Sequence, residues 1–259
     1  GIFGGVAADK WLGQKKSVFV GGIFIILGQF SMAIEGIIFF YTGLVFLVIG
    51  VGLLKPNIST MVGGLYKQGD SKRDAGFTLF YIGINIGALA APIIVGTVAE
   101  KIGWHLGFSI AGFGMIIGQI VYIAFRKHLD GVGDLLKHSK TNAHFANQPL
   151  TKIEKDRVIV LLISFLIVIV FWAAYEQAGG LMNLYARDKV DRFIFGWEMP
   201  TSYFQSLHAF YVVVIGAPMA WFWLKWSKKG KESSAIFKSA VGMIVMSLSF
   251  LVLMGAVYD

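Results

Sequence analysis

The sequence predicts an all-α protein that crosses a membrane about seven times. Hydrophobic residues make up 56% of the 259 residues and charged residues only 15%, whereas a soluble domain carries about 25% charged residues. The mean hydropathy is +0.69. The apolar residues gather in runs that approach the roughly 20 residues a transmembrane helix needs. We expect membrane-spanning helices at 17–34, 37–62, 75–99, 104–125, 158–178, 200–224 and 234–257.

A polar and basic stretch, residues 126–157, separates these runs into two groups. It is too polar to span a bilayer, so we expect it to form a cytoplasmic linker. The chain would then consist of an N-terminal bundle (1–125), this linker and a C-terminal bundle (158–259). The first eight residues are expected to end a further apolar helix.

The chain offers little for metal binding. It contains no Cys, which excludes disulfides and thiolate metal sites. His128, His138 and His144 are scattered through the linker, and no two of them share a close ligand spacing with a carboxylate. We therefore expect neither a metal ion nor another cofactor.

Lys and Arg residues are distributed unequally between the two sides of the apolar runs. Of the 23 basic residues, 18 lie in the loops on the same side as Asp9–Lys16, and four lie on the opposite side. Because cytoplasmic loops carry the excess of positive charge, the Asp9–Lys16 loop is predicted to be cytoplasmic. The net charge of +8 thus follows the topology, which favours a lipid bilayer over nucleic acid as the partner. We expect a multi-pass protein of the plasma membrane, which in a bacterium is the inner membrane.

Lys55 is the only charged residue in the apolar run 37–62. It lies about ten residues from the next polar loop, which at 1.5 Å per residue is roughly 15 Å, near the middle of a bilayer. A cation at this depth should face the bundle interior or a water-filled cavity and have a partner. Two interpretations remain open, a structural ion pair and a substrate or ion site.

Asn85, in the following run, is predicted to reach a depth similar to that of Lys55. Tyr81 lies one turn away from Asn85 on the same helical face. An ammonium, an amide and a phenol at one level could hold an anionic group such as a carboxylate. The alternative is ordinary hydrogen bonding between helices. Pro56 and Pro92 are expected to kink or loosen their helices.

Two further polar groups lie inside apolar runs. Burial favours the protonated form of Glu176, whereas a nearby cation favours its carboxylate. A group that switches between these forms suits a proton-coupled carrier, although a gate, a structural salt bridge or an interfacial position is also open. An unperturbed imidazole changes charge near neutral pH, so His208 is read either as a pH-sensitive group or as a hydrogen-bonded neutral residue.

Glycine spacing suggests close helix packing. The pairs Gly83–Gly87 and Gly114–Gly118 each follow the small-xxx-small pattern. Such pairs let two helices approach closely, so we expect contacts there.

Four motifs occur in order along the chain: Gly4–Gly13, Gly50–Ser59, Phe80–Leu89, which contains Phe-Tyr-x-x-Ile-Asn-x-Gly, and Phe171–Gln177, which reads Phe-Trp-x-x-x-Glu-Gln. Together they resemble the proton-dependent oligopeptide transporters, a branch of the major facilitator superfamily. The resemblance covers nearly the whole chain. It implies a partial major facilitator fold, with the end of helix two and helices three to nine.

The resemblance also implies roles for individual residues. Lys55 and Asn85 would help to bind the termini of a peptide, and Glu176 would take part in proton coupling. Tyr81 and Trp172 would line the cavity.

The eighth-helix motif departs from the family pattern. Gln205-Ser206-Leu207 is followed by His208-Ala209, where the family has Asn-Pro. Gln205 and His208 are therefore candidate substrate-binding residues, and the substrate type is less firmly implied. The first-helix Glu-x-x-Glu-Arg motif and the tenth-helix acidic residue of the family do not occur in this sequence.

These observations favour a monomeric carrier rather than an enzyme. The leading hypothesis is symport of protons with di- and tripeptides by alternating access in the full-length protein. One alternative is a related carrier of nitrate or a small anionic metabolite, which His208 motivates. Ranked below both is a seven-helix receptor or photoreceptor, in which a retinal-type Lys would occupy the last span rather than the second.

Overall fold

The computed structural model describes residues 1–67, 72–129, 131–134, 151–228 and 235–258. Most of the predicted linker, including His138 and His144, lies outside these described residues. The chain divides into two compact units. Unit 1 comprises Gly1–Pro149 and Asn183–Phe210, and unit 2 comprises Leu150–Met182 and Tyr211–Asp259. The division into two bundles at residues 126–157 stays a prediction.

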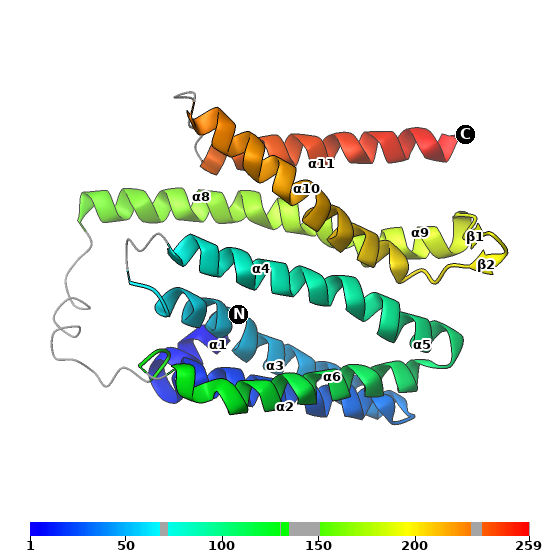
Figure 1. The fold of residues 1–259 in the computed structure, drawn as a ribbon, viewed down its shortest axis with the longest axis horizontal. Coiled ribbons are helices and arrows are strands. Elements are labelled where there is room, and N and C mark those ends of the chain that lie inside the picture. Colours follow the sequence, from blue (N-terminus) through cyan, green and yellow to red (C-terminus); the bar gives the residue numbers. More distant parts are fainter. Residues whose placement is uncertain (68–71, 130, 135–150, 229–234, 259) are drawn as a thin grey trace. The chain divides into compact units, whose positions relative to one another are not determined.

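Helices dominate both units (Figure 1). Unit 1 contains α1 (Ile2–Ala7), a π-helical segment (Ala8–Leu12), α2 (Gln14–Ala33), α3 (Ile37–Gly64), α4 (Lys72–Ala91), a second π-helical segment (Pro92–Gly96), α5 (Thr97–Lys101), α6 (Trp104–Phe125), a 3-10 turn (Arg126–Leu129), most of α9 (Leu181–Lys189), β1 (Phe193–Ile194), β2 (Trp197–Glu198) and the start of α10 (Tyr203–Lys228). Unit 2 contains α8 (Lys152–Tyr175), a 3-10 turn (Glu176–Ala178), the rest of α10, and α11 (Ala235–Tyr258).

Each predicted run falls on a helix, which confirms the all-α membrane fold. Among the described residues, six helical segments are long and apolar enough to cross a membrane. The predicted count of seven therefore differs by one from the count among the described residues. The difference lies at 200–224, where α10 runs from Tyr203 to Lys228 but the apolar stretch counted among the described residues is Tyr203–Gly216.

Helices α2 and α3 pack through two pairs of glycines. A Cβ added to Gly21 would lie 2.7 Å from the carbonyl oxygen of Gly50, and one added to Gly50 would lie 2.7 Å from that of Gly21. Gly28 and Gly43 meet in the same way further along the two antiparallel helices. A Cβ added to Gly28 would lie 2.9 Å from the carbonyl oxygen of Gly43, and one added to Gly43 would lie 2.7 Å from that of Gly28. The two backbones therefore touch, which only residues without a side chain allow.

The prediction of close contacts at Gly83–Gly87 and Gly114–Gly118 was wrong within the described structure. A Cβ added to any of these four glycines would meet no atom within 4 Å. The spacing was present, but no other described residue of the chain packs against these faces of α4 and α6 at the glycines. A small-residue pattern permits a close approach and does not by itself supply the partner.

Helix α6 is fixed to α2 by hydrogen bonds that cross between the helices. The buried side chain of Gln119 donates to the carbonyl oxygen of Phe19 at 2.9 Å. The Tyr122 hydroxyl donates to the carbonyl oxygen of Lys15 at 3.0 Å, and the Lys15 ammonium lies 3.1 Å from a carboxylate oxygen of Asp134. These bonds join α2 to α6, and the glycine contacts join α2 to α3, so the three helices form the core of unit 1.

Unit 2 begins with a well-formed helix start. The Thr151 hydroxyl accepts from the backbone N–H of Glu154, and the Glu154 carboxylate accepts from the backbone N–H of Thr151, which is a capping box. Helix α8 then runs to Tyr175 and gives way at Glu176 to a single 3-10 turn. Along α8 no residue is buried within the described structure, as expected for a helix facing lipid or another segment.

Candidate functional site

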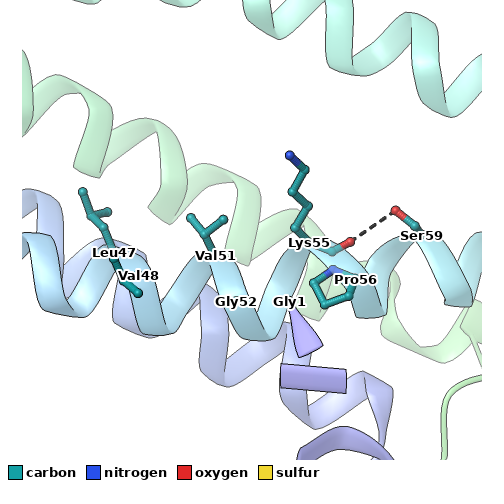
Figure 2. A pocket seen from close by; sticks show the side chains of 8 residues that line it. All are labelled: Gly1, Leu47, Val48, Val51, Gly52, Lys55, Pro56 and Ser59. Carbon is teal, nitrogen blue, oxygen red and sulfur yellow. Dashed lines mark hydrogen bonds between the residues drawn. The ribbon is translucent and has the colours of Figure 1, made fainter. Parts of the chain in front are cut away.

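Lys55 lies beside an open hollow on α3. The hollow has a volume of about 650 Å³, and its lining is mostly apolar, with Lys55 and Ser59 as the polar side chains. The other lining residues are Gly1, Leu47, Val48, Val51, Gly52 and Pro56. Figure 2 shows the Lys55 side chain extending away from the helix, with its ammonium at the tip. Among the described residues, no carboxylate lies within ion-pair distance of this ammonium. The structural ion pair considered from the sequence is therefore not formed within the described part of the chain.

The backbone next to Lys55 is loosened by Pro56. Proline has no N–H, so the turn before it lacks one helical hydrogen bond. Two side chains of the following turn bond back to the helix: the Ser59 hydroxyl donates to the carbonyl oxygen of Lys55 at 3.2 Å, and the Thr60 hydroxyl to that of Pro56 at 2.9 Å. Helix α3 nevertheless continues to Gly64, so Pro56 loosens the helix without ending it.

Asn57 is a residue that the sequence analysis missed. Its side chain is 3% exposed and donates to the carbonyl oxygens of Leu53 at 2.7 Å and Gly4 at 3.2 Å. The second bond joins α1 to α3 at the point where Gly4 meets the carbonyl of Gly52. Asn57 therefore fixes the helix that carries Lys55. A buried amide within an apolar run was the available signal.

Asn85 and Tyr81 lie one turn apart on α4, as predicted. The Asn85 amide is buried and donates to the carbonyl oxygen of Tyr81 at 2.9 Å, while the Tyr81 side chain is 56% exposed. Only the amide nitrogen of Asn85 takes part in this bond, and its amide oxygen can act as an acceptor. Among the described residues, neither Asn85 nor Tyr81 lines the hollow beside Lys55.

Glu176 and Trp172 belong to unit 2. Glu176 is the residue at which α8 ends, and its side chain is exposed. Three aromatic rings precede it: Trp172 packs against Tyr175 with ring centres 5.1 Å apart, and Tyr175 stacks on Phe171 at 5.8 Å. The carboxylate thus lies at a helix end beside an aromatic cluster.

Gln205 and His208 lie in the first two turns of α10, in unit 1. Both side chains are exposed, whereas their neighbours Ser206 and Ala209 are buried. The Ser206 hydroxyl donates to the carbonyl oxygen of Leu89 at 2.8 Å, which fastens this part of α10 to α4. Five of the seven predicted site residues therefore belong to unit 1 and two to unit 2.

Comparisons with known proteins identify relatives of the chain. The family model described as the POT family matches residues 15–133 and 128–257. The chain is 33% identical over 302 residues to an uncharacterized transporter, YclF, of Bacillus subtilis, with 97% of this chain and 61% of the relative covered. It is 33% identical over 314 residues to the peptide transporter YePEPT of Yersinia enterocolitica, with 98% of this chain and 61% of the relative covered.

The fold agrees with solved structures. A crystal structure of the peptide transporter POT in complex with sulfate matches with a TM-score of 0.78 and 30% identity. The match covers 98% of this chain and 62% of that chain. The chain thus spans about 61% of the length of the curated relatives it matches, and its helices are those of a multi-pass integral protein of the plasma membrane.

Proposed function

Because the chain belongs to the POT family, we propose that the full-length protein couples the uptake of di- and tripeptides to protons by alternating access. The observation that carries this proposal is Lys55, a cation deep in α3 beside a hollow of about 650 Å³. A peptide has a carboxylate at one end, which an ammonium within a membrane-spanning helix attracts. The relative YePEPT is named a peptide transporter, and this supports the substrate class.

Lys55 and Asn85 would bind the two ends of the peptide. The Lys55 ammonium would pair with the peptide carboxylate. The buried Asn85 amide already donates to its own helix, so its oxygen would accept from the peptide ammonium. Tyr81, whose ring is exposed on the same face, and Trp172 would line the cavity.

Glu176 would carry the coupled proton. In its ionised form a carboxylate at the end of α8 bears a full charge close to apolar rings, and protonation removes that charge. Protonation and peptide binding together would permit the change of state. The energy that drives uptake would then come from the inward movement of the proton.

Uptake of labelled dipeptide into proteoliposomes under an imposed proton gradient tests the proposal. We expect Lys55→Ala to abolish uptake and Glu176→Gln to abolish gradient-driven uptake while leaving counterflow of peptide. Lys16→Ala and Glu35→Gln are matched controls, because both side chains are exposed and lie outside the proposed cavity. Uptake at the unaltered rate in Lys55→Ala and Glu176→Gln would remove the assigned roles.

His208 motivates a second candidate, a carrier of nitrate or a small anionic metabolite. An imidazole can become cationic, whereas the asparagine that the family has at this position cannot. Competition separates the two functions: unlabelled dipeptides, and not nitrate, should suppress the uptake of labelled dipeptide. Effective competition by nitrate would favour the second candidate. The same proteoliposomes, prepared at one protein per vesicle, test whether a monomer suffices.

A further inference from the structure

The start of α10 is attached to the end of α5 by a dense group of contacts within unit 1. The Glu100 carboxylate accepts three hydrogen bonds: from the backbone N–H of Thr201 at 3.0 Å, from the Thr201 hydroxyl at 2.9 Å, and from the backbone N–H of Ser202 at 3.0 Å. Thr201 is 7% exposed. The two backbone groups belong to the unpaired N–H groups that precede a helix, and a carboxylate there also interacts favourably with the helix dipole.

Neighbouring residues extend these contacts on both sides. The Thr97 hydroxyl lies 3.1 Å from the Tyr203 hydroxyl. The Lys101 ammonium lies 4.8 Å from the centre of the Trp197 ring, and that ring packs against Tyr203 at 5.6 Å. We refer to Thr97, Glu100 and Lys101 on α5, together with Trp197, Thr201, Ser202 and Tyr203, as the clasp.

The backbone just before α5 allows the start of α10 to approach closely. Pro92 begins a π-helical segment that ends at Gly96, directly before α5. A Cβ on Gly96 would collide with the side chain of Ser202. Glycine at this position therefore permits the close approach that lets Glu100 reach the start of α10.

The clasp joins segments that the linker separates in sequence. Glu100 precedes residues 126–157 and Thr201 follows them, 101 positions later. Because the positive-inside rule makes the Asp9–Lys16 loop cytoplasmic, the α5–α6 turn and the start of α10 lie on the outer side. A carrier that alternates between two faces must separate its halves at each face in turn.

We propose that the clasp is a latch that holds the outer face closed, and that Glu100 is the residue that fastens it. This inference rests on the proposed function only in so far as it requires a carrier that alternates. Loss of the Glu100 carboxylate would leave three donors of Thr201 and Ser202, just before α10, without their acceptor and would favour the state open to the outside. The same loss would reduce the population open to the cytoplasm.

The test is the accessibility of single cysteines in the full-length protein, with any native cysteine replaced. Ala209 is 1% exposed and lies two turns into α10, so a cysteine there reports on the outer side. Ser59, near the cytoplasmic end of α3, provides the inner reporter. A membrane-impermeant maleimide is applied from each side, and the rate of labelling is measured without substrate.

We expect Glu100→Ala to raise labelling of Ala209→Cys about fivefold, which corresponds to the loss of charge-assisted hydrogen bonds at a partly exposed group, and to lower labelling of Ser59→Cys. Gly96→Ala, which forces the same surfaces apart, should act in the same direction. Thr201→Val, which removes one donor, should have a smaller effect. Glu35→Gln, an exposed glutamate in the turn between α2 and α3, should change neither rate.

Unchanged labelling at Ala209→Cys in both Glu100→Ala and Gly96→Ala would overturn the proposal. A rise at both reporters would also overturn it, because local unfolding exposes both sides whereas a latch exposes only one. If Glu100→Ala does not give a monodisperse protein, Thr201→Val and Gly96→Ala decide the question. Labelling needs no peptide, so a failure of peptide uptake would refute the substrate assignment and leave this result intact.

Discussion

Replacing Gly21 with Ala should destabilise the helix pair that carries Lys55. The new Cβ would lie 2.7 Å from the carbonyl oxygen of Gly50, 2.9 Å from the backbone nitrogen of Leu54 and 3.1 Å from the Cβ of Leu53. Two of these atoms are backbone, so no rotation of a side chain relieves the contact. The helices must move apart along the stretch that positions Lys55.

The magnitude follows from two opposing effects. Overpacking costs about 1–3 kcal/mol, and the better helix propensity of Ala returns about 1 kcal/mol. The net loss, centred on about 1 kcal/mol, lowers Tm by roughly 2–4 °C for a chain of this size. Thermal unfolding in detergent, followed by the monodisperse fraction, measures this change.

Gly114→Ala is the matched control for this prediction. It gives the same change of residue in an apolar helix, but its Cβ would meet no atom within 4 Å. Its Tm should stay unchanged or rise by roughly 2 °C, since only the propensity effect operates. Equal losses in Gly21→Ala and Gly114→Ala would refute the reasoning, because the effect would then come from glycine itself and not from the contact.

Three further predictions concern the same unit. Asn57→Ala removes the buried amide that joins α1 to α3, so it should lower the free energy of unfolding by about 1–2 kcal/mol and lower Tm. An unchanged Tm would show that the bond to Gly4 contributes nothing. Gly22→Ala should lower Tm because its Cβ collides with the amide of Gln119, and adding Gln119→Ala should recover part of this loss of stability. Strictly additive losses of stability in a double-mutant cycle would contradict the contact. Phe195 lies in the turn between β1 and β2, where it is fully exposed and has a φ of 50°. Phe195→Gly should therefore stabilise the hairpin by up to about 1 kcal/mol. Faster proteolysis of this turn in Phe195→Gly would count against the prediction.

The membrane fold was predictable because it depends on local properties of the chain. Length and polarity alone place the helices, and the described helices match the predicted runs within a few residues. Lys55 was found for the same reason, since one charge in an apolar run is visible without a structure. The glycine pairs show where this approach stops. Gly21 and Gly28 are seven residues apart, as are Gly43 and Gly50, so each pair shares a helical face. Which face meets which becomes visible only when the two antiparallel helices align.

The contacts of Glu100 were out of reach for a related reason. A glutamate near the end of an apolar run reads as a solvated loop residue, and its partners are backbone N–H groups, which every sequence position except proline possesses. Nothing in the local pattern around Thr201 marks it as a donor to a helix 101 positions earlier. Long-range polar contacts to the backbone therefore carry no sequence signature of their own.

The interruption of α8 has a mechanical consequence. The chain passes from unit 2 to unit 1 after Met182, a few residues beyond the end of α8 at Glu176 and beyond Gly179 and Gly180. It returns to unit 2 after Phe210, which lies inside α10. The first passage is pliable, because a short 3-10 turn and two glycines resist bending little. The second passage is stiffer, because it lies within the continuous helix α10. The link that contains Glu176, Gly179 and Gly180 is therefore the more pliable of the two, and the acid that would accept the proton lies within it.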